Sequence, residues 1–331
     1  GVWGAVAGLS LGLGPLVGGL LTDTIGWAAN FWLNVPVCLV AAIGAVLFVP
    51  ESRAARPRRF DPAGQILMLG LLAGAVGALI EGPEAGWSSS LVLTLAVLAV
   101  VCLALFTVVE RRVAEPLVDL RFFRSAAFSS SVLIAVMVFT VQGGCLFLVP
   151  LLLQGPFGYS ALMTGALILP MAAVLALSSP VSGRLVGHRG TRPSLVIGGA
   201  AISVASVMLV FISTGTPAWY LIIAFTMLGA GIGFINPPIT TTAVAGLPLS
   251  QAGTASGLAS ASRQVGVALG VAVAGLAAST DDLRLTAASH PVFRLTAVLG
   301  LVVAALGVVS TTRWARGTRH RLDALFNASD A

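Results

Sequence analysis

Residues 1–21 read GVWGAVAGLSLGLGPLVGGLL, and this stretch decides the fold. It carries no charge, and a helix of this length, at about 1.5 Å per residue, crosses a bilayer core of roughly 30 Å. Glycines recur at intervals of four, which places them on one helical face where a second helix can approach closely. Pro15 interrupts the helical hydrogen bonds and predicts a kink. The stretch is therefore predicted to be a closely packed membrane helix.

Composition extends this prediction to the whole chain. Of the 331 residues, 57% are hydrophobic and 9% are charged, against about 25% charged in an ordinary soluble domain. A β-barrel would instead show alternating strands of roughly ten residues. The prediction is an all-α polytopic membrane protein. Charge-free runs, divided at weak turn signals, predict ten spans at 1–21, 28–49, 63–81, 88–109, 127–153, 160–181, 194–213, 217–239, 255–279 and 292–312.

The arginines predict how the chain is oriented in the membrane. All eighteen basic residues are arginine. Four lie in 51–59, four in 111–124, three in 184–192 and four in the tail, so these fifteen all follow even-numbered spans. Arginine-rich loops stay in the cytoplasm, so both ends of the chain are predicted to be cytoplasmic. The net charge of +6 thus reflects membrane topology and does not indicate nucleic acid as a partner.

Three observations bear on cofactors and on the start of the chain. Cys38, Cys102 and Cys145 occur singly in apolar spans, without the spacing of a metal site or a disulfide framework. We therefore predict no metal and no cofactor. The chain starts with glycine inside an apolar run, without a methionine or a charged leader, so it is expected to be a fragment of a longer protein.

Three motifs resemble one known family. Gly14-Pro15-x-x-Gly18-Gly19 resembles the antiporter motif of the major facilitator superfamily, which lies on the fifth helix of proton-coupled exporters. The stretch WAANFWLNVP at 27–36 resembles the entrance to the sixth helix of the fourteen-helix drug:proton antiporters. The stretch LVPLLLQGPFGYSALMTGALILP at 148–170 resembles the same branch. The resemblance runs from the fifth helix to the fourteenth and lacks the first four.

The resemblance implies a division of the chain. Residues 1–50 would hold the last two helices of the first six-helix half, and 51–109 a cytoplasmic linker with an inserted helix pair. Residues 110–126 form a cytoplasmic amphipathic loop, 127–312 the complete second half, and 313–331 a cytoplasmic tail. The inserted pair is apolar all round, so it is expected to face lipid.

A cytoplasmic loop motif is expected at GRLVGHRGTRP, residues 183–193. The resemblance assigns Gly183, Arg184, Gly190 and Arg192 to it. Gly187 occupies the position where the family has an acidic residue, so the internal ion pair of the motif cannot form here. A tight turn with solvated arginines is the simpler interpretation.

Polar residues inside the spans are candidates for a substrate path: Gln142, Gln154, Asn236, Arg263 and Gln264. Asn236 precedes two prolines, and its amide either satisfies backbone carbonyls that the prolines free or lines a cavity. Arg263 lies roughly 12 Å inward if its helix starts near residue 255. We find no acid at matching depth in the chain. A carboxylate of the absent helices or a lipid phosphate reached by snorkelling would then pair with it.

The function implied by the resemblance is efflux of small hydrophobic or cationic compounds in exchange for protons, across a bacterial plasma membrane. Alternating access would rock two halves about a midplane site. The partners would be the substrate, protons, the lipid bilayer and the missing first helices of the same protein, which would also supply the acid for proton coupling. Two alternatives are a carrier of another solute, such as a sugar or siderophore, and a transport-incompetent fragment. A membrane enzyme is disfavoured because the spans hold no cluster of His, Asp or Glu.

Overall fold

The computed structural model describes residues 2–49, 61–113, 116–118, 120–244, 249–278 and 282–312. These residues form ten α-helices and one short 3-10 helix, η1. Nine of the described α-helices, α2 to α10, are long and apolar enough to cross a membrane. This architecture confirms the predicted all-α polytopic fold. The elements are α1 (Val2–Thr24), α2 (Ala29–Phe48), α3 (Pro62–Ala85), α4 (Ser90–Glu110), η1 (Leu120–Arg124), α5 (Ala126–Gln154), α6 (Ala161–Arg189), α7 (Thr191–Val210), α8 (Ala218–Val244), α9 (Leu249–Ala278) and α10 (Asp282–Val309).

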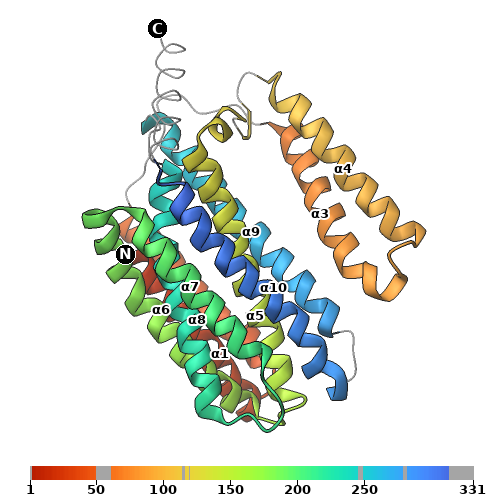
Figure 1. Cartoon of the computed structure of the whole chain (residues 1–331), viewed down its shortest axis with the longest axis vertical. Coiled ribbons are helices and arrows are strands. Elements are labelled where there is room, and N and C mark those ends of the chain that lie inside the picture. Colours follow the sequence, from red (N-terminus) through yellow and green to blue (C-terminus); the bar gives the residue numbers. More distant parts are fainter. Residues whose placement is uncertain are drawn as a thin grey trace.

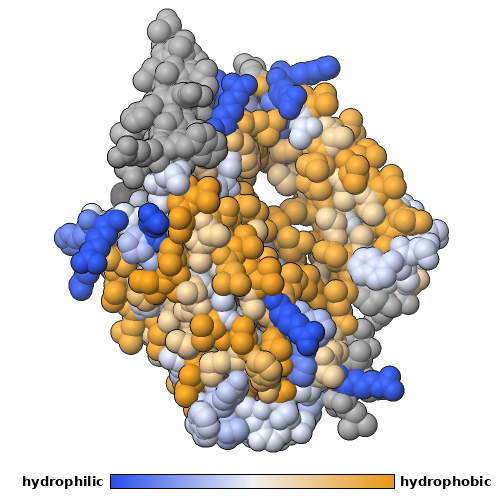
Figure 2. All heavy atoms as spheres, in the orientation of Figure 1, coloured by the Kyte–Doolittle hydropathy of each residue, from blue (hydrophilic) through white to orange (hydrophobic). Residues whose placement is uncertain are grey.

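Helices α5 to α10 form one bundle with a continuous apolar core. Within it α5 packs along α9, α6 along α8, and α7 along both α8 and α10 (Figure 1). Leu148, Ile202, Phe225 and Phe293 are among the buried core side chains. Much of the visible outer surface is also apolar (Figure 2). Such a surface suits lipid, because acyl chains are as apolar as the side chains that face them.

The first two helices relate to this bundle in different ways. Helix α1 runs along α6, whereas none of the residues of α2, all of which the structure describes, is buried. The two are joined near the turn between them, where the Asn30 Nδ2 donates to the Thr22 hydroxyl at 2.9 Å. The Thr22 hydroxyl in turn donates to the carbonyl of Gly18 at 2.7 Å. A short chain of hydrogen bonds therefore fixes how α2 leaves α1.

Helices α3 and α4 form a hairpin beside the bundle, which it meets through α3 and α9 (Figure 1). Glycine allows the two helices to cross closely. A Cβ added at Gly74 would lie 2.7 Å from the Leu95 carbonyl oxygen and 2.9 Å from the Ala99 nitrogen. Gly70 lies in the same way against the Cys102 sulfur. The hairpin is thus held together mainly by its own packing.

The helix ends differ most from the predicted spans at two places. Helix α6 continues to Arg189, although the span was predicted to end at residue 181. Helix α10 begins at Asp282, ten residues before the predicted start, so Arg284 and His290 lie inside it. The physical reason is that hydropathy marks only the part of a helix within the apolar core. A helix satisfies its own backbone groups equally well among headgroups and water.

Candidate functional site

The antiporter-like motif lies at the crossing of α1 with α6. A Cβ added at Gly19 would lie 2.8 Å from the carbonyl carbon of Ala161 and 3.0 Å from the Cα of Leu162. A Cβ added at Gly165 would lie 2.9 Å from the carbonyl carbon of Pro15. Real side chains do not tolerate such distances, so both positions require glycine. The two helices therefore meet backbone to backbone at two successive levels.

The four residues of the motif do not share this contact equally. Gly19 and the carbonyl of Pro15 face α6, as just described. A Cβ at Gly14 would meet no atom within 4 Å among the described residues, and one at Gly18 would meet the Asn30 side chain at 3.5 Å. The close approach expected of all four residues is thus made at Pro15 and Gly19, because the rotation of α1 turns Gly14 and Gly18 away from α6.

A second glycine crossing, between α5 and α9, lies inside the bundle. A Cβ at Gly143 would lie 2.8 Å from the Cα of Val267, and one at Gly144 would lie 3.1 Å from the Gly270 carbonyl oxygen. Gly266 lies against α5 in the same way. This crossing brings the α9 backbone against α5 and sets where the neighbouring Arg263 reaches.

Arg263 projects from α9 toward α8 and α5. Only 9% of its surface is exposed. Its Nη2 donates to the Thr240 hydroxyl at 2.6 Å, and its guanidinium carbon lies 5.7 Å from the centre of the Phe139 ring. A buried guanidinium gains from both contacts, since a hydroxyl oxygen accepts a hydrogen bond from its N–H and an aromatic face attracts its charge. Neither a hydroxyl nor a ring was anticipated as a partner for this residue.

The other candidates for a substrate path are only partly brought together. Asn236 precedes Thr240 by one turn of α8; it is 9% exposed, and its Oδ1 has no hydrogen-bond partner within the described part of the chain. Gln142 is half-buried, one turn beyond Phe139 on α5, and Gln264 is exposed on α9. Gln154 is exposed at the end of α5, twelve residues from Gln142 and hence about 18 Å further along. The structure therefore places Asn236 and Gln142 each one turn from a residue that contacts Arg263, turns Gln264 to the exposed side of α9, and leaves Gln154 apart.

The cytoplasmic loop motif is not a loop for most of its length. Gly183 and Arg184 lie within α6, and Arg192 is exposed in the first turn of α7. Gly190 alone separates the two helices, with a φ of +77° that favours glycine. The prediction of a loop from residue 183 was therefore wrong, because the helix extends beyond the apolar core until Gly190 ends it.

Sequence reasoning missed a pair of buried carboxylates at one end of the α3–α4 hairpin. Asp61 is 8% exposed and Glu110 is 4% exposed. Oxygens of both side chains lie beside Gly64, where a Cβ would have to fit. The Asp61 Oδ1 accepts from the Gly64 nitrogen at 2.9 Å and caps α3, while the Glu110 Oε2 accepts from the Val118 nitrogen at 3.2 Å. The signal that could have found them is an acidic residue just before the first helix of an apolar hairpin and another at the end of the second, because the two positions meet in space.

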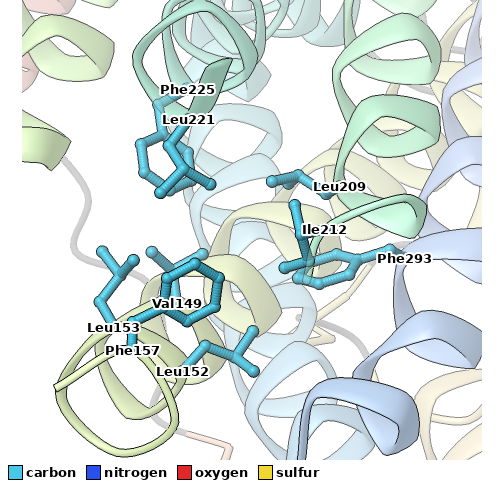
Figure 3. A pocket seen from close by; sticks show the side chains of 9 residues that line it. All are labelled: Val149, Leu152, Leu153, Phe157, Leu209, Ile212, Leu221, Phe225 and Phe293. Carbon is cyan, nitrogen blue, oxygen red and sulfur yellow. The ribbon is translucent and has the colours of Figure 1, made fainter. Parts of the chain in front are cut away.

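The bundle also contains an apolar cavity, which Figure 3 shows with its nine lining side chains. They come from α5, α7, α8 and α10 and from the turns that follow α5 and α7. The cavity has room for about 10 Å³, roughly what a single water needs. In this conformation it is a small gap in the core and is too small to hold a drug-sized molecule.

Comparison with known proteins bears on most of the chain. A profile described as Major Facilitator Superfamily matches residues 1–271. Multidrug resistance protein Stp of Mycobacterium tuberculosis is 36% identical over 275 residues, which cover 83% of this chain and 51% of that protein. The tetracenomycin C resistance and export protein of Streptomyces glaucescens is 36% identical over 283 residues, covering 83% of this chain and 52% of that protein.

A third relative, the puromycin resistance protein pur8 of Streptomyces alboniger, is 36% identical over 279 residues, covering 82% of this chain and 55% of that protein. The chain thus spans about half the length of the curated relatives that it matches. The motifs in α1, α2 and α5–α6, the helical architecture and these relatives agree with one another. The chain belongs to the major facilitator superfamily, a family of membrane transporters.

Proposed function

We propose that this chain forms part of a proton-coupled exporter of small hydrophobic or cationic compounds in a bacterial plasma membrane. The relatives described above carry names of multidrug, tetracenomycin C and puromycin resistance, and the similarity covers more than four fifths of this chain. The observation that carries the proposal is the backbone crossing of α1 with α6. It places the antiporter-like motif against the neighbouring bundle, where closure between two halves would occur.

The proposed mechanism is alternating access. Residues 1–50 belong to one half and 127–312 to the other, with the inserted pair in 51–109, the linker in 110–126 and the tail in 313–331. The arginine distribution supports cytoplasmic chain ends, so the α1–α2 turn and the start of α6 would face outward. The α1–α6 crossing then closes the outer side, and opening this side requires the two helices to separate.

The proposed substrate path runs beside Arg263 and Asn236. These two residues supply a buried cation and a buried amide oxygen, and the Thr240 hydroxyl and the Phe139 ring contact the cation. Gln142 would join the path one turn beyond Phe139 and Gln264 beside Arg263 in the chain, while Gln154 would act only near the outer end of α5. A few polar groups on an apolar lining are typical of sites that accept varied small molecules.

The test is efflux from a bacterium that lacks its own drug pumps. Residues 1–331 are expressed alone and together with any segment that the gene encodes upstream of residue 1, and loss of ethidium fluorescence is followed. Efflux that an uncoupler collapses would support the proposal. Efflux that continues after the uncoupler would indicate a carrier without proton coupling. Absence of efflux from both forms, each present in the membrane, would contradict the proposed function.

A further inference from the structure

The end of α1 makes a hydrogen bond to α6 that neither the motif nor the glycine packing accounts for. The Asp23 Oδ2 accepts from the backbone nitrogen of Leu162 at 2.9 Å. The two residues lie 139 positions apart in the chain. Leu162 is the second residue of α6, and its nitrogen is one of the four that a helix cannot satisfy by itself. Asp23 therefore caps a helix that belongs to another part of the molecule.

Helix α6 also has a cap of its own. The Ser160 hydroxyl accepts from the nitrogen of Met163 at 3.2 Å, as is usual for the residue before a helix. Asp23 adds a negative charge at the same end, where the aligned peptide dipoles present a partial positive charge. The contact is exposed and combines a charge–dipole interaction with a hydrogen bond, a combination that contributes up to about 1 kcal/mol, or about fivefold in an equilibrium, at an exposed helix end.

The neighbours of Asp23 on α1 do not reach α6 in this way. The Thr24 hydroxyl donates to the Leu20 carbonyl at 2.6 Å, within α1. The Thr22 hydroxyl bonds to Gly18 and Asn30, which belong to α1 and α2. Asp23 follows Gly19 by one turn, so its cap lies directly beyond the level at which the two backbones touch.

We propose that Asp23 is a positioning residue that latches the outer ends of α1 and α6 in the closed arrangement. The inference rests on the proposed transport function, because it concerns how that function is gated. When α1 and α6 separate, the carboxylate loses the Leu162 nitrogen and is solvated by water, while α6 keeps its Ser160 cap. Asp23 therefore stabilises the closed arrangement without being needed for α6 to fold.

The test measures how often α1 and α6 separate at their crossing. A reporter cysteine replaces Thr164, which is 3% exposed and lies one turn beyond Ala161 on α6, after the three native cysteines have been changed to alanine. A membrane-impermeant maleimide is applied to intact cells. The rate of maleimide labelling at the reporter cysteine is compared among three variants. Asp23→Ala removes the hydrogen-bond acceptor, Asp23→Asn keeps an acceptor without the charge, and Thr24→Ala is the control. A cysteine at the exposed outer-turn residue Thr214 normalises for protein amount.

We expect the labelling rate to rise about threefold to fivefold in Asp23→Ala, to rise about twofold in Asp23→Asn and to be unchanged in Thr24→Ala. Equal rates in Asp23→Ala and Thr24→Ala would overturn the proposal. If Asp23→Ala does not reach the membrane, the comparison of Asp23→Asn with Thr24→Ala decides in the same way. Labelling needs no transport, so faster labelling without any efflux would support the latch while contradicting the proposed function.

Discussion

Two of the helix crossings that glycine makes possible, α5–α9 and α1–α6, have different surroundings. Helices α5 and α9 both belong to the bundle and are packed against further helices of it. Helix α1 touches α6 over much of its length but makes only slight contact with α2 and α8. Both crossings bring backbones into contact, at Gly143 and Gly270 in the first and at Gly19 and Gly165 in the second.

The comparison teaches that glycine packing by itself does not distinguish a fixed interface from one that opens. In lipid, helices associate through van der Waals contact and hydrogen bonds, with little hydrophobic drive. Separating α5 from α9 would also break the contacts that each makes with other bundle helices. Separating α1 from α6 breaks one crossing and the Asp23 cap. We therefore expect the first crossing to support folding and the second to support transport.

The largest effect is expected at the α5–α9 crossing. In Gly270→Leu the new side chain meets the backbone of Thr140 and Gly144, which cannot move aside. We expect a loss of about 3 kcal/mol in the free energy of unfolding and little protein in the membrane. The matched control is Gly275→Leu on the same helix, where a Cβ meets no described atom within 4 Å. Unfolding in detergent measures both, and equal stability of the two variants would contradict a fixed crossing.

The second prediction concerns the α1–α6 crossing. Gly165→Leu should insert normally but lose about tenfold in efflux, because the closed arrangement no longer forms. Gly14→Leu should change efflux less than about twofold, since the space around Gly14 is open. Both are measured by ethidium efflux at matched membrane levels. The idea fails if Gly14→Leu proves as harmful as Gly165→Leu, or if Gly165→Leu transports normally.

A third prediction tests whether the charge of Arg263, beside the α5–α9 crossing, is needed for transport. Arg263→Leu removes the hydrogen bond to Thr240 and the contact with Phe139, and we expect efflux to fall about tenfold. Arg263→Lys keeps the charge and should retain part of the activity. The free energy of unfolding of Arg263→Leu should change much less than that of Gly270→Leu. Normal efflux by Arg263→Leu would show that the arginine is not needed in the path.

The smallest effect is expected at the α3–α4 crossing, which lies outside the bundle. Gly74→Ala forces a Cβ against the backbone of Ala99, so the hairpin should loosen locally. Labelling of the buried Cys102 by a membrane-permeant maleimide should rise about threefold, while efflux stays within about twofold of the parent. The control is Gly77→Ala, whose nearest contact would be the flexible Leu95 side chain, at 3.3 Å from the new Cβ. A loss of efflux as large as that in Gly165→Leu would place this hairpin in the transport mechanism.

Much of the fold could be predicted from the sequence because long apolar runs leave a membrane protein few alternatives. Helix ends were harder, as α6 and α10 show. Arg184 and His290 lie inside these helices although they were expected outside the spans. Hydropathy measures how a side chain suits lipid, whereas a helix ends where its backbone turns, as at Gly190.

The candidate site was less predictable, because its contacts join distant parts of the chain. The motif indicated that α1 packs closely, but the rotation of α1 decides that Gly19 faces α6 and that Gly14 does not. Nothing local to Asp23 points to Leu162 as its donor. Gln154 and Arg263 were both chosen as candidates because they are polar residues in apolar spans. Gln154 nevertheless lies at the end of α5, several turns beyond the residue Phe139 that contacts Arg263.

Gly190 has a mechanical consequence. It is the single residue between α6 and α7, so the adjacent ends of these helices stay fixed to each other. Helix α6 is also joined to α8, where the Ser179 and Ser182 hydroxyls donate to the carbonyls of Gly233 and Phe234. The bundle therefore holds α6 from two sides, through the turn to α7 and through α8. The crossing would then open by a movement of α1 relative to the whole bundle, with α6 as its fixed side.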